Sequence, residues 1–434
     1  MLIRDVEVAG RGRVDVRVLT GRIAEIGRGL PGPGDLDGHG GALLPGLHDH
    51  HVHLTALAAE AASVRVGPAD VHGRAGLAAA LRAGPPGEWV RAVGYHESVA
   101  GELDRAALDA LVPDRPVRVQ HRTGAMWFLN TAALRAAGLD TADGDGRLWR
   151  ADERLRRLVP AVPLDLAAVG RRAARLGVTG FTNADPHPRA GLAQVLSVLP
   201  QRLVVMSADP SAVASAHPAA KTPTDPPVKL MLDDPTLPTP DELAATITEL
   251  RPRPVAVHCV TRVQLLVTLL ALDEAGPIEG DRIEHAAVVP AETVEWIRRL
   301  GVTVVTQPHF PVERARAYAT DVRPDDRPHL YRCRSLAAAG VPLAAGTDAP
   351  YGTHDPWAVM RAAVRRDDGE ALTPEDALRL FLGSPERPAQ PRELTVGSAA
   401  DLCLLQVPRR EALDALSAEA VRATYIAGEP IHTL

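Results

Sequence analysis

A His-x-His pair, His51 and His53, lies in the run Leu47–Leu54 and constrains the fold more than any other feature of the chain. Alternate side chains leave the same face of a β-strand, so both imidazoles of such a pair can reach one cation. Pro45 and Gly46 come directly before the run and supply a sharp turn into it. The pair is weak evidence by itself, since the chain has 16 histidines. A metal site would also require further ligands at the ends of neighbouring strands.

Three other apolar runs end in, or lead directly to, a residue type that binds metal ions: His258, His285 and Asp348. Either histidine alone would more often be a core residue, and Asp348, which precedes Ala349 and Pro350, could simply cap a turn. Together they place imidazole or carboxylate groups at the ends of four predicted strands. Such a set favours a metal site over a group of unrelated buried residues.

Lysine usage adds a sixth candidate. The chain has 48 basic residues, of which only Lys221 and Lys229 are lysines. Lys229 lies in the apolar run Pro227–Leu232, where an unpaired ammonium group would be costly to bury. A buried lysine can lose its proton and react with carbon dioxide to form an anionic carbamate, which a guanidinium group cannot do. The alternative is a lysine whose ammonium group reaches water from the end of a strand.

In their order along the chain, these motifs resemble those of the amidohydrolase superfamily, and within it the YtcJ-like group. The opening motif of that group is matched by Pro45-Gly46-x-x-Asp49-x-His51-x-His53-Leu54. Further segments resemble its second strand, sixth strand, eighth strand and closing signature: Gly177–Thr182, Arg282–Ala286, Gly340–Pro350, Leu372–Leu378 and Gly397–Leu402. The resemblance runs from about residue 3 to the C-terminus.

The resemblance implies a (β/α)8 TIM barrel that hydrolyses a C–N bond of a small amide with two divalent ions. Active sites of such barrels lie at the C-terminal ends of the strands, where all six candidates fall. One ion would be held by His51, His53 and Asp348 and the other by His258 and His285, with carboxylated Lys229 and a hydroxide bridging the two. Asp348 would also carry the proton from the nucleophile to the leaving nitrogen. Zinc is the expected metal, with manganese, iron and nickel as alternatives.

The expected layout has a small domain built from both chain ends around a barrel. Residues 1–44 and 393–434 read as short strands that form one β-sandwich, and residues 45–392 as the barrel. Strand-like runs alternate with helical stretches in the barrel, near 43–53, 178–183, 202–208, 227–232, 254–258, 281–285, 302–306 and 342–347. About 125 residues separate the first two strands, so an inserted lid-like subdomain is expected at about 60–165, with strands near 89–96 and 116–121.

Residues that contact substrate are harder to predict. The candidates are Tyr95, His96, His121 and Arg122 in the insertion, with Gln307 and His309 after the seventh strand. Two segments depart from the family pattern: Gly124-Ala125-Met126 lacks a histidine found in many members, and Thr261-Arg262-Val263 replaces a usual Gly-Asp-Arg. Neither departure touches a proposed metal ligand, but both affect what is inferred about substrate.

Composition excludes some functions. The net charge of −6 argues against nucleic acid as a partner, and no run of about 18 apolar residues predicts a membrane span. Early charges at the N-terminus do not resemble a signal peptide. Three widely spaced cysteines indicate neither disulfides nor a zinc ribbon, so a cytoplasmic protein is expected. A homodimer is compatible with this kind of barrel. The rival functions are a mononuclear deaminase, which would not need Lys229, and a metal-binding relative without activity.

Overall fold

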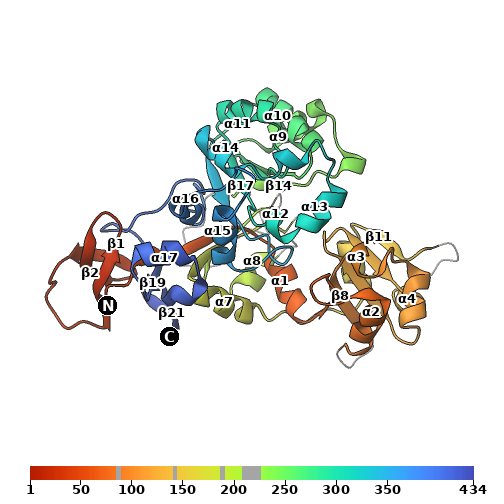
Figure 1. Ribbon diagram of the computed structural model, residues 1–434, viewed down its shortest axis with the longest axis horizontal. Helices are drawn as coiled ribbons and strands as arrows, with labels where there is room; N and C mark the ends of the chain where they lie inside the picture. The colour runs from red at the N-terminus through yellow and green to blue at the C-terminus, as the bar shows by residue number, and fades with distance from the viewer. Residues whose placement is uncertain (85–88, 140–143, 186–190, 208–225) are drawn as a thin grey trace. The chain divides into compact units, whose positions relative to one another are not determined.

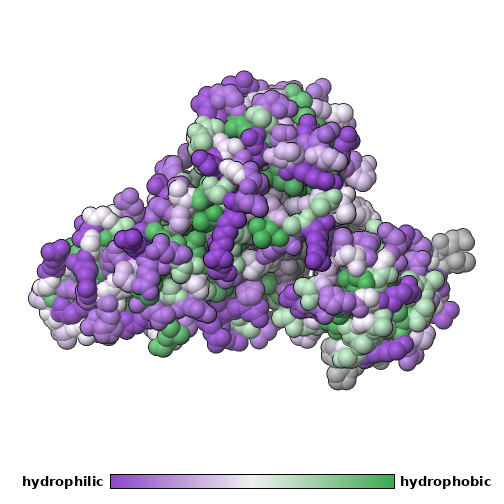
Figure 2. Space-filling model, in the orientation of Figure 1, coloured by the Kyte–Doolittle hydropathy of each residue, from purple (hydrophilic) through white to green (hydrophobic). Residues whose placement is uncertain are grey.

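The structure is a computed structural model that describes residues 1–84, 89–139, 144–185, 191–207 and 226–434. The chain forms two compact units: the first joins Met1–Leu54 to Leu166–Leu434, and the second is Thr55–Asp165. Hydrophilic side chains cover most of the face seen in Figure 2. In the described ranges, no helix combines the length and the apolar character that a membrane span requires.

Two parallel sheets form the centre of the first unit. One has the order β13-β12-β6 and the other β14-β15-β16-β17-β18. Their strands are β6 (Leu47–Val52), β12 (Val178–Asn183), β13 (Arg202–Val205), β14 (Val228–Leu230), β15 (Val255–Cys259), β16 (Arg282–His285), β17 (Thr303–Thr306) and β18 (Leu343–Ala345). The chain is thus a mixed α/β protein with parallel sheets, as predicted. The described residues do not record these strands as one closed sheet.

Helices follow the parallel strands along the chain. They are α7 (Leu166–Arg175), α8 (Leu192–Leu196), α9 (Pro240–Leu250), α10 (Arg262–Ala275), α11 (Val294–Leu300), α12 (Phe310–Glu313), α13 (Ala315–Asp321), α14 (Cys333–Ala338), α15 (Pro356–Val364), α16 (Pro374–Arg379) and α17 (Arg409–Ala415), with single 3₁₀ turns at Asp234–Thr236, Ala291–Thr293, Arg327–His329 and Ala418–Ala420. In Figure 1, α9, α10, α11 and α14 lie together beside β14 and β17. Side chains from these helices and from β15, β16 and β17 share one buried apolar cluster, which fixes the five-stranded sheet.

The start of α9 shows how local sequence sets these helices. Thr239 accepts a hydrogen bond from the Glu242 backbone, and the Glu242 carboxylate accepts one from the Thr239 backbone N–H at 2.8 Å. This reciprocal capping box satisfies two N–H groups that the first helical turn leaves unpaired, and Pro240 occupies the first position, where no N–H is needed.

The predicted strand at 43–53 is in fact two strands. β5 (Leu43–Pro45) pairs with β19 (Leu402–Leu405) in an antiparallel sheet, whereas β6 joins the parallel sheet. Gly46 separates them because a Cβ at this position would lie 2.2 Å from the Thr179 side chain on β12. The sequence of residues 43–53 alone does not show that the chain changes sheets at the glycine.

Both chain ends form four-stranded sheets. The N-terminal sheet has the order β3-β2-β1-β4 and the C-terminal sheet β21-β20-β19-β5. The additional strands are β1 (Leu2–Val8), β2 (Gly12–Leu19), β3 (Arg22–Gly27), β4 (Leu36–Asp37), β20 (Val421–Ile426) and β21 (Glu429–Thr433). Ile3, Val16, Leu402 and Tyr425 belong to one buried cluster that includes residues from both sheets. The two ends of the chain therefore share a hydrophobic core.

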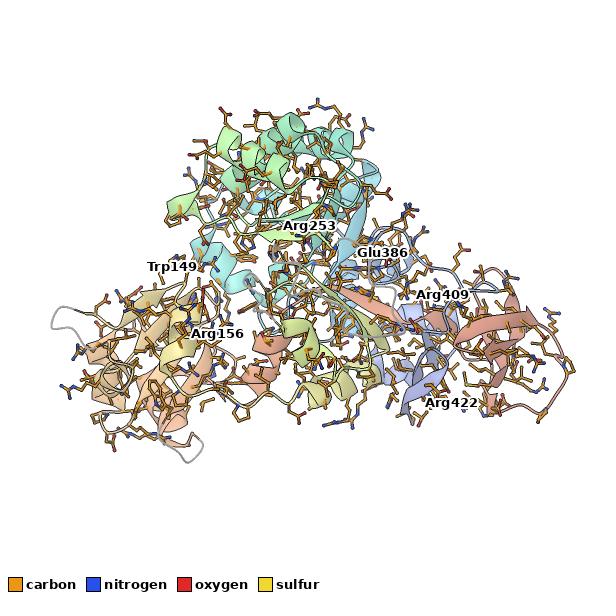
Figure 3. The ribbon with its side chains drawn as sticks, turned by 180° about the vertical axis from the view of Figure 1, so that it is seen from behind. Trp149, Arg156, Arg253, Glu386, Arg409 and Arg422 are labelled. Atoms are coloured by element: carbon orange, nitrogen blue, oxygen red, sulfur yellow. The ribbon has the colours of Figure 1, made fainter. Side chains whose placement is uncertain are left out.

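Two arginines labelled in Figure 3 also connect the chain ends. The Arg409 guanidinium lies 2.7 Å from a carboxylate oxygen of Glu375, and its backbone N–H donates to the Glu7 carboxylate. Arg422 on β20 donates to the Asp37 carbonyl on β4 at 2.7 Å. These contacts join β1 and β4 to C-terminal elements far along the sequence.

The second unit is an α/β body whose sheet has the order β11-β10-β9-β8-β7. Its residues overlap the range of about 60–165 given for the insertion. It contains α1 (Leu54–Ala61), β7 (Val64–Arg65), α2 (Gly73–Arg82), β8 (Val90–Tyr95), α3 (Glu97–Ala100), α4 (Arg105–Leu111), β9 (Val117–His121), β10 (Met126–Leu129), α5 (Thr131–Ala136), β11 (Arg147–Trp149) and α6 (Asp152–Leu158). The strands predicted near 89–96 and 116–121 correspond to β8 and β9. A separate buried cluster, which includes Tyr95, Val119 and Phe128, gives this unit its own core.

Candidate metal centre

Three of the predicted ligands converge where β6 and β18 end. The ligand atoms of His51, His53 and Asp348 all lie within 4.8 Å of one another. Oδ1 of Asp348 is 3.1 Å from Nε2 of His53 and 3.6 Å from Nε2 of His51. Main-chain bonds hold the two segments together, since the Asp348 N–H donates to the His51 carbonyl and the His53 N–H to the Ala349 carbonyl. Two imidazoles and one carboxylate thus surround a single point.

Backbone features near Asp348 make this approach possible. A Cβ at Gly346 would lie 2.5 Å from the backbone nitrogen of His51, so only glycine lets the chain pass so closely. Asp348 has a φ of 52° and His285 a φ of 70°, in the left-handed region that most residues avoid. Strained backbone of this kind concentrates at functional sites, where the surrounding structure holds it in place.

His258 and His285 extend the group of imidazoles. The ring centroid of His285 lies 4.6 Å from that of His258 and 4.7 Å from that of His51. Nδ1 of His285 is 2.8 Å from the side-chain carbonyl oxygen of Gln307, an acceptor, so this nitrogen carries the proton. Nε2 of His285 therefore keeps its lone pair for a cation. Gln307, which was predicted to contact substrate, orients a candidate ligand in this structure.

Lys229 lies on β14, paired with Ala256 of β15, and its side chain is buried. Among the described residues, its Nζ has no hydrogen-bond partner. Burial lowers the pKa of the amine to about 8, although the charges of Glu284 and Asp348 act in the opposite direction. At that pKa, about one amine in ten is neutral at pH 7, against about one in 2,500 for an ordinary lysine. The residue has the reactive form that carboxylation requires.

Two buried carboxylates hold the ligands in place. Glu284 accepts a hydrogen bond from Nδ1 of His51 and another from Nε of Arg282 at 2.7 Å, so the Nε2 lone pair of His51 faces the centre. Asp49 accepts bonds from the backbone N–H groups of Thr347 and His51 at 3.0 and 3.2 Å. Burial raises the pKa of the Asp49 carboxyl to about 6 despite these bonds.

Asp185 is a further candidate residue, which the sequence did not predict. Its Oδ1 lies 3.3 Å from Nδ1 of His53, on the side of the ring opposite Asp348. Burial alone would lower the pKa of His53, but contact with Asp185 and Asp348 outweighs burial and raises it to about 9. The available signal was a carboxylate two residues beyond the second predicted strand, at the edge where active sites of parallel α/β folds lie.

We expect Asp185→Asn to weaken metal binding by about 10- to 100-fold, because a carboxylate that orients a ligating imidazole and increases its basicity is lost. Zinc titration at about pH 8 measures the change. Asp241→Asn is the control, since Asp241 is exposed on α9, and it should bind zinc like the wild type. Equal affinities in both variants would show that Asp185 does not support the centre.

Metal uptake should also depend on pH. With a pKa of about 9, His53 holds a proton in the metal-free protein at neutral pH, and an incoming ion must displace it. The affinity is therefore fully present above about pH 9 and falls about tenfold for each unit of pH below that value. Zinc titrations between about pH 6 and pH 8 test this slope. An affinity that stays constant over this range contradicts the role of His53.

The predicted substrate residues divide between the two units. His309 follows β17 in the first unit, where both ring nitrogens are buried without a hydrogen bond among the described residues. Burial lowers the pKa of His309 to about 3, so the ring is neutral. Tyr95, His96, His121 and Arg122 belong to the second unit. The Tyr95 hydroxyl donates to the Gly101 carbonyl at 2.6 Å, and the Arg122 backbone N–H donates to the Tyr95 carbonyl. Substrate contact by these residues stays a prediction.

Comparison with known proteins gives the family. The model of the amidohydrolase family matches residues 36–432, which is most of the chain, so the chain belongs to this family. It is 23% identical over 427 residues to YtcJ of Bacillus subtilis (strain 168), which bears the name of an amidohydrolase, and the match covers 81% of each protein. It is 27% identical over 165 residues to N-substituted formamide deformylase of Arthrobacter pascens, covering 34% of this chain and 30% of that one.

Solved structures share the fold. An uncharacterized metal-dependent hydrolase from Pyrococcus furiosus superposes with a TM-score of 0.69 at 21% identity, covering 93% of this chain and 98% of the other. N-isopropylammelide isopropylaminohydrolase from Burkholderia multivorans superposes with a TM-score of 0.55 at 20% identity, covering 99% of this chain and 97% of that enzyme. The resemblance identified in the sequence is therefore confirmed at the level of the family.

Proposed function

We propose that this protein is a metal-dependent hydrolase that cleaves the C–N bond of a small amide-type molecule. The observation that carries the proposal is the convergence of His51, His53 and Asp348. The rings of His285 and His258 lie beside this group. A buried lysine, Lys229, lies on the adjoining sheet. Two similar proteins act on C–N bonds by their names, a formamide deformylase and an isopropylaminohydrolase. Both names agree with hydrolysis at nitrogen.

The donor set fits divalent ions. Among the buried polar atoms of the described residues that lack a hydrogen bond, three belong to predicted ligands: Nε2 of His51, Oδ1 of Asp348 and Nζ of Lys229. Buried polar atoms are rarely left unsatisfied, so their clustering indicates an absent partner that is positively charged or electrophilic. In the proposed centre, His51, His53 and Asp348 hold one ion and His258 and His285 the other. Zinc suits imidazole and carboxylate ligands, and manganese, iron and nickel are alternatives.

Lys229 would bridge the two ions after carboxylation. Its neutral amine adds to carbon dioxide, a C–N bond forms as one C=O π bond breaks, and one proton is released to solvent, which would leave a carbamate with one negative charge shared by two oxygens. The low pKa of the amine favours this reaction, and the absence of a hydrogen bond at Nζ leaves the nitrogen free to react. A buried ammonium group at Lys229 would be costly without a partner. The carbamate that replaces it would be stabilised by two cations.

Divalent ions in this centre would supply a water nucleophile at neutral pH and polarise the scissile carbonyl. Asp348 would accept the proton of the attacking water and deliver it to the leaving nitrogen. Burial alone would raise the pKa of Asp348, but its contacts with His53, His285 and His51 hold the pKa below its usual range. The carboxylate therefore starts as the base that this role needs. The neutral ring of His309 is available to position substrate.

We extend the proposal to the architecture and setting. The two parallel sheets would form one closed (β/α)8 barrel, supported by the main-chain bonds that join Asp348 to His51 and His53 to Ala349. The two terminal sheets would form a β-sandwich around their shared core. Three buried free cysteines agree with a reducing cytoplasm. The partner would be a small-molecule substrate rather than nucleic acid or a membrane, and a homodimer is compatible with the fold.

A substrate screen tests the function. The zinc-loaded protein is incubated with N-formyl and N-acyl amines, lactams, carbamates and amino-substituted heterocycles, and the release of amine or ammonia is measured. Hydrolysis of an amide with metal-dependent turnover supports the proposal. Ammonia release from heterocycles alone, with a single ion in the first centre, favours the mononuclear deaminase, and bound metal without turnover across the panel favours a relative that lacks activity.

A further inference from the structure

A second group of metal-binding side chains lies wholly within the second unit, at the ends of two neighbouring parallel strands. His96 directly follows β8, and His121 is the last residue of β9. The two strands pair in parallel with Tyr95 opposite His121, which brings the imidazoles together with a ring-centroid distance of 5.9 Å. Glu97, the first residue of α3, faces both rings. The ligand atoms of the three residues lie within 4.8 Å of one another.

The spacing of these atoms matches shared coordination better than simple hydrogen bonding. Oε2 of Glu97 lies 3.3 Å from Nε2 of His121 and 3.6 Å from Nε2 of His96. Hydrogen bonds between imidazolium and carboxylate are shorter, about 2.7–2.9 Å. Two atoms that are each about 2.1 Å from one tetrahedral zinc ion are about 3.4 Å apart. Similar separations, 3.1 and 3.6 Å, occur among Asp348, His53 and His51 at the first centre.

Each imidazole also has a partner that can orient it for metal binding. Nδ1 of His96 lies 2.8 Å from the hydroxyl of Ser98, and Nδ1 of His121 lies 2.8 Å from the hydroxyl of Thr123. Each Nδ1 also accepts a hydrogen bond from a backbone N–H, from Ser98 at 3.2 Å in His96 and from Thr123 at 3.3 Å in His121. These contacts hold both rings with Nε2 toward Oε2 of Glu97. Histidines that ligate metals are commonly fixed in this way by their second nitrogen.

The cluster is partly open to solvent, which suits an exchangeable ion. The side chains of His96 and His121 are 14% and 15% exposed, and that of Glu97 is 36% exposed. The exposed side of the cluster leaves room for water as a fourth ligand.

We propose that His96, Glu97 and His121 form a second metal site, a three-residue zinc site that ties the ends of β8 and β9 to the start of α3. This assigns His96 and His121 a role other than substrate contact. The site does not depend on the first centre, because all three ligands and both orienting hydroxyls belong to residues 96–123. Zinc is favoured over magnesium or calcium because two of three ligands are imidazoles.

Metal counting on the full-length protein tests the site. After equilibrium dialysis against micromolar zinc, the wild type should retain one more zinc ion per chain than either Glu97→Gln or His121→Ala. Glu97→Gln preserves the shape of the side chain, so its folding should be unaffected. His72→Ala is the matched control, because His72 is an exposed histidine of the same unit outside the cluster. This control should retain as much zinc as the wild type.

Crystals of the zinc-loaded protein provide an independent readout. Anomalous diffraction at the zinc absorption edge should show a peak bounded by His96, Glu97 and His121 in the wild type and none there in Glu97→Gln. Two results would overturn the proposal: no peak at this position, or equal zinc content in the wild type and both variants. Binding of zinc only at millimolar concentration would also overturn the proposal, because such weak binding indicates an adventitious ion only.

Discussion

Replacing Asp348 with asparagine should lower kcat/KM by about 1,000-fold or more. Asparagine keeps the size of the side chain but cannot accept the proton of the attacking water, and general acid–base groups contribute about 10²- to 10⁴-fold to catalysis. It also removes the negative charge that lies 3.1 Å from His53 and 3.6 Å from His51. Steady-state kinetics with an amide found in the substrate screen measure the loss, and metal analysis of the same sample reports the occupancy.

The matched control is Asp367→Asn, an exposed aspartate of the same unit, which should retain the kinetics of the wild type. A fall in kcat at full metal occupancy places Asp348 in the proton transfer. If Asp348→Asn keeps more than about a tenth of the wild-type activity with its metal intact, another group carries the proton and the proposed role of Asp348 is wrong.

Replacing Lys229 with alanine should remove the bridge between the ions. We expect the first centre to lose at least one of its two ions, and kcat/KM to fall by about 1,000-fold or more, because the ligand shared by both ions is lost. Formate or acetate supplied at high concentration should restore part of the activity, since a small carboxylate offers the same two oxygens as the carbamate. Kinetics with and without added carboxylate provide the measurement.

Lys221 is the natural control for this experiment because it is the only other lysine in the chain, and it lies outside the described residues. Lys221→Ala should keep both the metal and the activity. The outcome also separates the two enzyme classes. A Lys229→Ala variant that keeps one metal and wild-type turnover would contradict a binuclear centre and favour the mononuclear deaminase.

Much of the fold follows from patterns that depend on neighbouring residues. Apolar runs such as Val255–Val257 predict strands because they are short and bounded by turn residues, and β15 spans this run. The candidate ligands were found for the same reason, since His258, His285 and Asp348 stand directly at or after such runs. Each of these signals depends only on residues that are neighbours in the sequence, so a single sequence is enough to predict them.

Features that depend on contacts between distant segments could not be predicted. Only glycine fits at the change of sheet, because a Cβ at Gly46 would meet the Thr179 side chain, more than a hundred residues away. The role of Gln307 depends on its distance to His285, and that of Asp185 on its distance to His53. Side chains reach these partners only in the folded chain, so residue type and spacing carry little information about them.

The most direct test of the central claim is anomalous diffraction from crystals of the protein loaded with zinc in the presence of bicarbonate. The account predicts two peaks in the first unit, one bounded by His51, His53 and Asp348 and the other by His258 and His285, with carbamate density on Lys229 between them. A single peak beside an unmodified Lys229, or no peak among these residues, would contradict it.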